Sequence, residues 1–247
     1  IKQYCPGFYQ FGDRIFGCWL AEGHGDINLT EAISVSCDVF FYKTIKQIKL
    51  NALHDSFKQF GFGLKTNIDI PNEVSGLVPD KDYMLKRYGK YGWSRGVLLN
   101  LAIGQGELLV TPIQVLNYVN LLATKGDSPS CHFVFVDNLP SNVKPVLKND
   151  IWDNIHKGLR EAIVAENGTG KKANINLEGF KLYGKTGTAE NSHGDDHAWF
   201  VGWTEYKNKK HSIVILLENA GSGGTVAAPM ARKVFNKLFL KNELVFK

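Results

Sequence analysis

The sequence predicts an α+β fold in which helices flank an antiparallel sheet. Three apolar segments with the character of strands lie close together toward the C-terminal end, at residues 180–183, 199–203 and 213–217. A turn-like Lys-Asn-Lys-Lys at 207–210 separates the last two, so we expect the three to form an antiparallel meander. Amphipathic segments elsewhere predict the helices that cover this sheet.

Four helical segments are predicted from caps and apolar periodicity. The clearest begins at Thr111, because Pro112 then takes the first helical position and Gln114 completes a capping box; Gly126 ends it. The other three cover about 29–48, interrupted or begun near Ser36, then 149–164, and 229–240.

Length and composition indicate a single domain over residues 1–247. A hydrophobic fraction of 44% can supply one large core. Residues 64–100 mix prolines and glycines with charges and aromatic residues, which predicts a long excursion within the domain. The net charge of +5 comes from scattered lysines without a basic stripe interleaved with aromatic residues, so no nucleic-acid partner is expected. No apolar run approaches the ~20 residues of a membrane span.

The most informative motif directly follows the first predicted strand, where residues 184–188 are Gly-Lys-Thr-Gly-Thr. Lys185 supplies a cation, Thr186 and Thr188 supply hydroxyls, and Gly187 leaves the backbone open to approach. Placed at the end of a strand, these groups suit the binding of a carboxylate and of a developing oxyanion. A plain threonine-rich edge strand is the alternative.

Further blocks lie upstream and downstream in a fixed order. Residues 34–42 contain Ser36-x-Asp38 followed by Phe-Phe-Tyr. The other blocks are Ala-Ile-Gly-Gln-Gly at 102–106, Thr-Pro-Ile-Gln at 111–114 and Ala-Pro-Met-Ala-Arg at 228–232. As a set, from about residue 23 to 240, they resemble the transpeptidase domain of elongation-type class B penicillin-binding proteins, the penicillin-binding protein 2 group.

The resemblance implies a penicillin-binding transpeptidase fold, similar to that of the serine β-lactamases, and a role for each motif residue. Ser36 would relay a proton toward the leaving amine, and Asp38 would accept hydrogen bonds from the catalytic lysines and substrate amides. Lys185 would hold positive charge in the cleft. A helix N-cap is the alternative for Ser36, and a solvated surface acid is the alternative for Asp38.

The strand of the Lys185 motif would bind the substrate. By the same resemblance, Thr186 and Thr188 would hold the terminal carboxylate of a D-alanyl-D-alanine stem. Gly187 would let the substrate backbone join the strand as an added neighbour. The Thr188 N–H would form half of an oxyanion hole, and the nucleophile would supply the other half.

The Ser-x-x-Lys motif that carries the family's nucleophile is not found in its expected place. Only Ser141-x-x-Lys144 has the right letters, and it lies in a polar loop downstream of Ser36. In relatives the nucleophile precedes the second motif by several dozen residues, more than the 35 that precede Ser36 here. We therefore expect the domain to be truncated at its N-terminal side.

The implied function is that of a serine-type D,D-transpeptidase, which crosslinks peptidoglycan stem peptides during cell elongation and is acylated by β-lactams. A polytopic glycosyltransferase and a rod-shape scaffold protein are the implied partners, and the periplasmic face of the inner membrane is the implied location. A β-lactamase of the same fold or a β-lactam-sensing module are the alternatives.

Three cysteines and a histidine lie in the first 37 residues: Cys5, Cys18, His24 and Cys37. Three thiols and an imidazole are a full ligand set for a structural zinc ion, although their spacing is not that of a finger or ribbon. In an extended segment 36–38, Cys37 would face away from the side shared by its two neighbours, so a metal there would brace the motif from behind. Some elongation-type relatives have a zinc site of two aspartates, a histidine and a cysteine beside this motif. A Cys5–Cys18 disulfide or buried free thiols are the alternatives.

Overall fold

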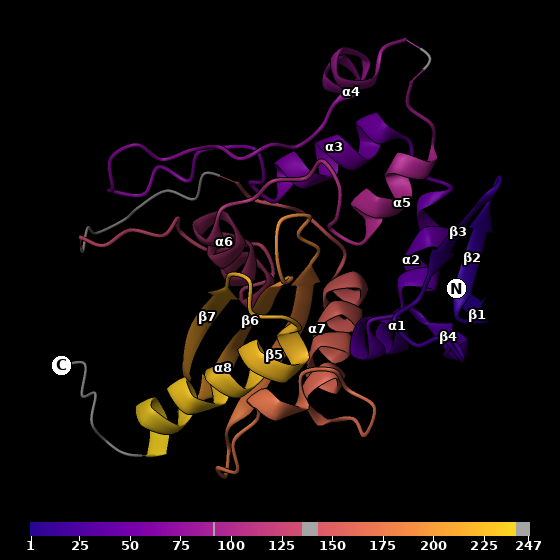
Figure 1. Cartoon of the computed structure of the whole chain (residues 1–247). Helices are drawn as coiled ribbons and strands as arrows, with labels where there is room; N and C mark the ends of the chain where they lie inside the picture. The colour runs from indigo at the N-terminus through magenta and orange to yellow at the C-terminus, as the bar shows by residue number, and fades with distance from the viewer. Residues whose placement is uncertain (91, 135–142, 241–247) are drawn as a thin grey trace.

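A computed structural model describes residues 1–90, 92–134 and 143–240 of the chain. Figure 1 shows a sheet with helices on both sides, beside a second region of short helices and short paired strands. The predicted α+β architecture is confirmed. None of the helices in the described part of the chain combines the length and apolar character needed to cross a membrane.

The sheet is the predicted meander. Strands β5 (Lys181–Ala189), β6 (His197–Tyr206) and β7 (Lys209–Leu217) pair antiparallel in the order β5-β6-β7. Lys207 and Asn208 adopt positive φ angles of 49° and 61° and form the tight turn between β6 and β7. The Lys185 motif lies inside β5 and not at its end, since the strand continues to Ala189. We had expected the shorter strand because its alternation stops at the small and polar residues of the motif.

Helices cover the two faces of the sheet (Figure 1). Helix α8 (Ala228–Phe235) packs Phe235 against Phe180 and the buried Leu182 and Phe200 on one face. Helices α6 (Pro112–Ala123) and α7 (Asn149–Val164) cover the other face, where Trp152 and Trp203 are buried together. Burial of these large rings supplies much of the apolar area that fixes the sheet.

Helix α6 has the predicted capping box. The Gln114 amide donates to the Thr111 hydroxyl at 3.2 Å, and the Gln114 side chain accepts from the Thr111 amide at 2.9 Å. The same carboxamide donates to the carbonyls of Leu64 and Ser75, each at 2.7 Å. The helix start therefore also anchors the beginning of the 64–100 excursion.

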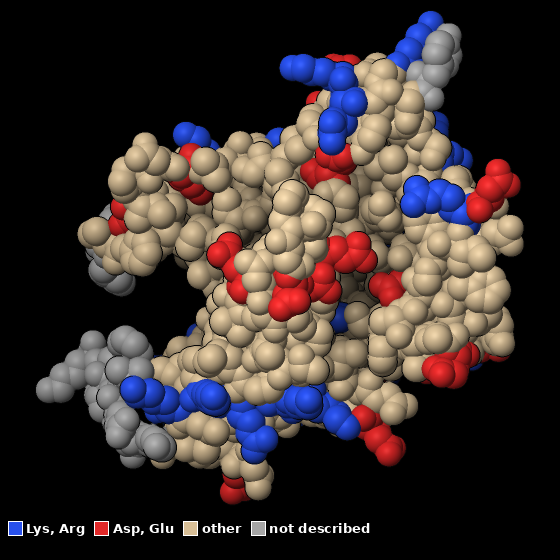
Figure 2. Space-filling view, in the orientation of Figure 1, with Lys and Arg blue, Asp and Glu red and all other residues tan. Residues whose placement is uncertain are grey.

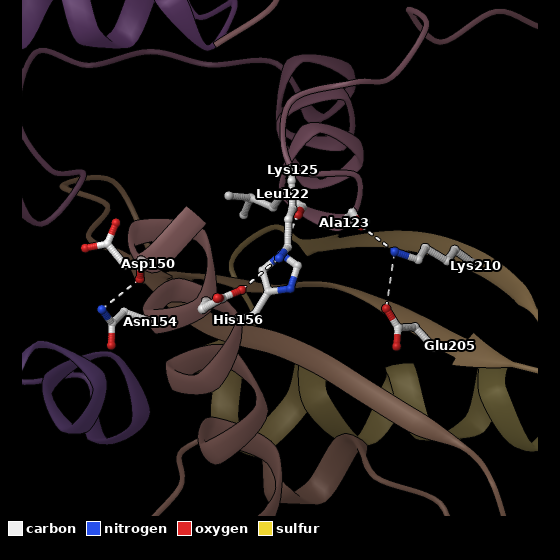
Figure 3. A network of polar contacts seen from close by, with 9 residues as sticks. Leu122, Ala123, Lys125, Asp150, Asn154, His156, Glu205 and Lys210 are labelled. Atoms are coloured by element: carbon white, nitrogen blue, oxygen red, sulfur yellow. Dashed lines mark hydrogen bonds and ion pairs between the residues drawn. The ribbon is translucent and has the colours of Figure 1, made fainter. Parts of the chain in front are cut away.

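The C-terminal carbonyls of α6 accept hydrogen bonds from α7 and from the sheet (Figure 3). His156 Nε2 of α7 donates to the Leu122 carbonyl at 2.7 Å, and Lys210 Nζ of β7 donates to the Ala123 carbonyl at 2.6 Å. Lys210 also pairs with Glu205 at 3.3 Å. These carbonyls have no partner within α6 and accept from α7 and β7 instead. The hydrogen bonds therefore hold α6, α7 and the sheet together.

The predicted 29–48 helix is two helices, α1 (Leu29–Val35) and α2 (Asp38–Ile45). Of the two expectations for Ser36, an interruption or a start of the helix, the interruption is confirmed: Ser36 has φ 59° and ψ 49° and ends α1 in the left-handed conformation. Helix α1 packs on α7, and Gly158 permits their close approach: a Cβ at Gly158 would lie 2.8 Å from the Ile33 Cβ. This contact brings the end of α1 to the sheet.

Several elements were not predicted. Residues 64–100 contain α4 (Lys81–Tyr88) and the start of α5 (Gly96–Ala102), and α3 (Leu50–Gln59) precedes them. Four-residue strands form two hairpin-like pairs before α1. These are β1 (Lys2–Cys5) with β4 (Gly25–Asn28), and β2 (Phe8–Phe11) with β3 (Arg14–Gly17). Such short strands carry too little alternation to be recognised. The predicted 229–240 helix is confirmed as α8 followed by a wider helical turn over Asn236–Leu240.

Candidate active site

A large open cleft of about 1790 Å³ lies between the sheet and the helical region. Figure 2 shows it as a hollow with acidic side chains on its rim and a basic side chain inside. All six residues predicted for catalysis and substrate binding line it: Ser36, Asp38, Lys185, Thr186, Gly187 and Thr188. Two motifs that are far apart in the sequence therefore share one surface.

The Lys185 ammonium joins the two motifs across the cleft. Nζ donates to the Ser36 hydroxyl at 2.8 Å, a contact between residues 149 positions apart, and to the Thr186 carbonyl at 3.0 Å. Lys185 points toward α1 because β5 alternates its side chains, so that Leu182 faces α8 and Lys185 faces the opposite side.

Two expectations about residues 36–38 are wrong. The segment is not extended, because Ser36 is left-handed and Asp38 already opens α2. Ser36 is also not a helix N-cap; it follows the last residue of α1, and Cys37 takes the N-cap position of α2. The sharp turn still sends the three side chains apart, with Ser36 toward Lys185, Asp38 into the cleft and Cys37 into the protein, fully buried.

Burial shifts the pKa values of the two charged groups of the cleft in opposite directions. It raises the pKa of Asp38 to about 6, while a hydrogen bond from the Trp19 amide, at 3.1 Å to the carboxylate, works against this shift. It lowers the pKa of Lys185 to about 8, and the Asp38 charge opposes that change. Both groups therefore titrate near neutral pH, which is the range useful for proton transfer.

The far end of the motif is fixed by the segment before α8. The Gly223 amide donates to the Thr188 hydroxyl at 3.2 Å, which leaves the hydroxyl proton of Thr188 available for an anion. Gly223 is the residue that fits here, since a Cβ would lie 2.3 Å from the Gly187 carbonyl oxygen and 2.4 Å from that of Trp199. The backbone thus approaches β5 as closely as its own atoms permit.

The Gly-Gln-Gly block lies on the opposite wall. Gln105 Nε2 donates to the Thr188 carbonyl at 2.9 Å. Two residues on, the Glu107 carboxylate accepts from Tyr83, at 2.8 Å, and from Tyr88, and both hydroxyls belong to α4. These bonds hold the pKa of Glu107 below its usual range. The 64–100 excursion is thereby tied to the loop that touches β5.

The four predicted metal ligands also come together. One ligand atom from each of Cys5, Cys18, His24 and Cys37 lies within 4.8 Å of all the others. His24 Nδ1 is 3.6 Å from the Cys5 sulfur and 3.5 Å from the Cys18 sulfur. A sulfur at about 2.3 Å and a nitrogen at about 2.0 Å from a tetrahedral zinc ion lie roughly 3.5 Å apart, so these separations fit a shared ion.

The alternative of a Cys5–Cys18 disulfide is wrong, because both residues are free cysteines. Cys37 donates a hydrogen bond to Cys18, which lowers the pKa of the Cys18 thiol and raises that of Cys37. One sulfur of the group therefore favours the thiolate form that a metal requires.

Comparison with known proteins agrees with this geometry. Residues 2–236 match the family described as the penicillin binding protein transpeptidase domain. The chain belongs to this family. The peptidoglycan D,D-transpeptidase MrdA of Haemophilus influenzae is 33% identical over 94% of the chain and 39% of its own length.

Solved structures of this family have the same fold. The penicillin-binding protein PBP2 of Helicobacter pylori superposes with a TM-score of 0.87 at 34% identity, over 99% of this chain and 46% of that one. The complex of PBP2 and MreC from the same organism gives 0.84 at 33% identity, over 97% and 46%. The resemblance to the elongation-type group is confirmed, and the chain spans less than half the length of these relatives.

Two residues of the cleft had no role in the sequence prediction. The two glycines that flank Gln105 were the signal in the sequence for an unusual backbone there. In the structure, Gly104 and Gly106 adopt positive φ angles of 77° and 79°. Trp19 binds Asp38 through its amide and the Val35 carbonyl through its indole N–H at 2.9 Å. An exposed tryptophan next to a cysteine was the only signal for it. Ser141, which fits the nucleophile motif by chance, lies outside the described residues.

The lowered pKa of Lys185 gives a direct prediction. In an NMR titration of lysine side chains, Lys185 should titrate near pH 8, well below the ~10.4 of a lysine in a model peptide. Asp38→Asn should lower the pKa of Lys185 further, because it removes the charge that favours the ammonium. A Lys185 that titrates at the model-peptide value would contradict the burial of its ammonium in the cleft.

Proposed function

We propose that this chain is the transpeptidase domain of a protein that crosslinks peptidoglycan stem peptides in cell-wall elongation. The observation that carries the proposal is the 2.8 Å hydrogen bond from Lys185 to Ser36, which connects the second and third motifs of the family across one cleft. Relatives named peptidoglycan D,D-transpeptidase MrdA support it.

In the proposed reaction, the serine of a Ser-x-x-Lys motif attacks the carbonyl carbon of the penultimate D-Ala. Its hydroxyl proton goes to the neutral lysine of that motif, which passes it on to Ser36. The C–N bond breaks, and Ser36 passes a proton to the departing nitrogen, so that terminal D-Ala leaves as a neutral amine. The Lys185 ammonium keeps the Ser36 hydroxyl oriented for this transfer. The amine of a neighbouring stem peptide then takes the acyl group and gives up its proton by the reverse route.

The Lys185 strand binds the acyl donor in this scheme. The hydroxyls of Thr186 and Thr188 hold the terminal carboxylate, and the Thr188 N–H stabilises the oxyanion. Gly187 lets the substrate backbone lie against the strand. Asp38 receives hydrogen bonds from substrate amides and from the catalytic lysines. A β-lactam enters as a mimic of the donor and stays attached to the serine.

A β-lactamase or a β-lactam-sensing module of the same fold would also be acylated. The transpeptidase is favoured because relatives with that name match 94% of the chain. Formation of a crosslinked peptide from a donor and an amine acceptor distinguishes it from both alternatives. Rapid hydrolysis of the adduct would indicate the β-lactamase, and an adduct without any transfer would indicate the sensor.

The relatives also support a proposal about partners and location. The Helicobacter pylori PBP2 has been solved with MreC, and we propose a rod-shape scaffold protein of this kind as a partner. A polytopic glycosyltransferase, which supplies the glycan strands, is the second proposed partner. We further propose the periplasmic face of the inner membrane as the location of the domain.

We also propose a structural zinc ion held by Cys5, Cys18, His24 and Cys37. The ligand separations support it, and the donor set of three thiols and an imidazole is one that zinc prefers. Such a closed site would leave the chemistry to the cleft. It would fix the loop that carries Trp19, and through the Trp19 amide it would hold the Asp38 carboxylate.

The proposed function is tested by labelling with a fluorescent penicillin. The full-length protein, which carries its own nucleophile, should form a covalent adduct, and Lys185→Ala should slow its formation by about 10²-fold or more, because a preorganised electrostatic partner is lost. Labelling should also slow as pH rises through about 8, where the Lys185 ammonium loses its proton. Lys181→Ala, an exposed change on the same strand, is the matched control and should label like wild type. Equal rates for the two variants would remove Lys185 from the mechanism.

The zinc proposal is tested by metal analysis of protein purified without added zinc. One zinc ion per chain is expected, and a strong chelator should lower both the melting temperature and the rate of penicillin labelling. Cys18→Ser should lose the metal, whereas Cys131→Ser, at a cysteine outside the cluster, should keep it. Metal-free protein with a normal melting temperature and a normal rate of labelling would contradict the zinc proposal without affecting the transpeptidase proposal.

A further inference from the structure

Strand β5 has a free edge along the cleft, because it is the outer strand in the order β5-β6-β7. Neighbouring carbonyls of such a strand point alternately toward β6 and away from it. Tyr183 O lies on the β6 side, since a Cβ at Gly202 of β6 would be 2.2 Å from it. The carbonyls of even-numbered residues, Thr186 and Thr188 among them, therefore point away from the sheet.

Side chains from three places donate to these outward carbonyls. Arg160 Nη1 of α7 reaches Leu182 O at 2.9 Å, and Lys185 Nζ reaches Thr186 O at 3.0 Å. Gln105 Nε2 reaches Thr188 O at 2.9 Å. An exposed strand edge is a template for an added strand, and side-chain donors of this kind keep it covered. Gln105 covers the part where a substrate backbone would have to pair.

The loop around Gln105 is built to hold this position. The Gln105 amide donates to Asn100 O at 2.9 Å and so caps the end of α5. Gly104 and Gly106 have positive φ angles of 77° and 79°, which let the chain turn on both sides of Gln105. Glu107 then fixes the loop to Tyr83 and Tyr88 of α4. The backbone of the loop is thus held, so that the contact with Thr188 depends on the Gln105 side chain alone.

We propose that Gln105 is a placeholder for the acyl donor: its carboxamide occupies the Thr188 carbonyl until an amide N–H of the donor replaces it. The inference rests on the proposed transpeptidase function and adds a residue that sets how readily the donor binds. A ligand with an amide N–H next to the reacting carbonyl has to displace Gln105, whereas a ligand without that N–H has no use for the Thr188 carbonyl. Gln105 therefore weakens only the first kind of ligand.

The expected effect is modest and specific. A side chain to backbone hydrogen bond shifts an equilibrium by roughly two- to tenfold, and a site closed by it binds more weakly by the same factor. Gln105→Ala should raise the second-order rate constant of acylation by a penicillin with an acylamino side chain about two- to tenfold. The rate at saturation should stay the same, because the chemical step does not involve Gln105.

The experiment uses stopped-flow acylation of the full-length protein with two β-lactams, one with an acylamino side chain and a carbapenem without an amide N–H at that position. Gln105→Met removes the donor but keeps the volume of the side chain, and it should behave like Gln105→Ala. Gln59→Ala, an exposed change in α3, is the control. Both Gln105 variants should accelerate the acylamino compound and leave the carbapenem within about twofold of wild type.

Three results would overturn the placeholder role. The first is no acceleration of the acylamino compound in either variant, and the second is an equal acceleration of both β-lactams. The third is an acceleration in Gln105→Ala alone, which would show that the effect comes from the smaller side chain and not from the lost hydrogen-bond donor. Failure of the wild-type protein to be acylated by either compound would instead overturn the proposed function on which the inference rests.

Discussion

The hydrogen bond between Lys185 and Ser36 is the constraint on which the site depends. It joins a strand of the sheet to the end of α1, over 149 positions of sequence. The packing of α1 on α7, and of α7 on β5, holds its two ends, and the capped C-terminus of α6 ties α7 to the sheet. A shift of α1 by a fraction of an ångström would lengthen this bond, so the helices behind the sheet contribute to the geometry of the cleft.

The motif is supported from its other side by the cysteine cluster. Cys37 lies in the cluster while its neighbours Ser36 and Asp38 face the cleft, and Trp19 next to Cys18 donates to the Asp38 carboxylate. The cluster therefore adjoins the motif in two places, at Cys37 in the chain and at the Asp38 carboxylate by way of Trp19. In the proposed scheme, the cysteine and histidine side chains set positions, and the oxygen and ammonium groups in the cleft carry out the chemistry.

The sequence predicted the meander, the capped helix α6 and the residues of the cleft, because each has a local signature such as a capping box at Thr111 or a lysine-threonine-glycine run. It did not predict the left-handed Ser36, since a serine seldom takes that conformation and only tertiary packing selects it. The strands before α1 are too short to show a period. Gln105 was read as part of a motif without a role, because its contact with Thr188 crosses 83 positions and appears only once the chain is folded.

The central claim is that Ser36 and Lys185 act as one unit, and a double-mutant cycle on the acylation rate tests it most directly. Ser36→Ala, Lys185→Ala and the double variant are compared with wild type in the full-length protein. If the two groups work through their shared hydrogen bond, each single change should cost about 10²-fold and the double variant little more, because either change already breaks the unit. Costs that multiply to about 10⁴-fold in the double variant would show that the two residues act independently, and would contradict the account.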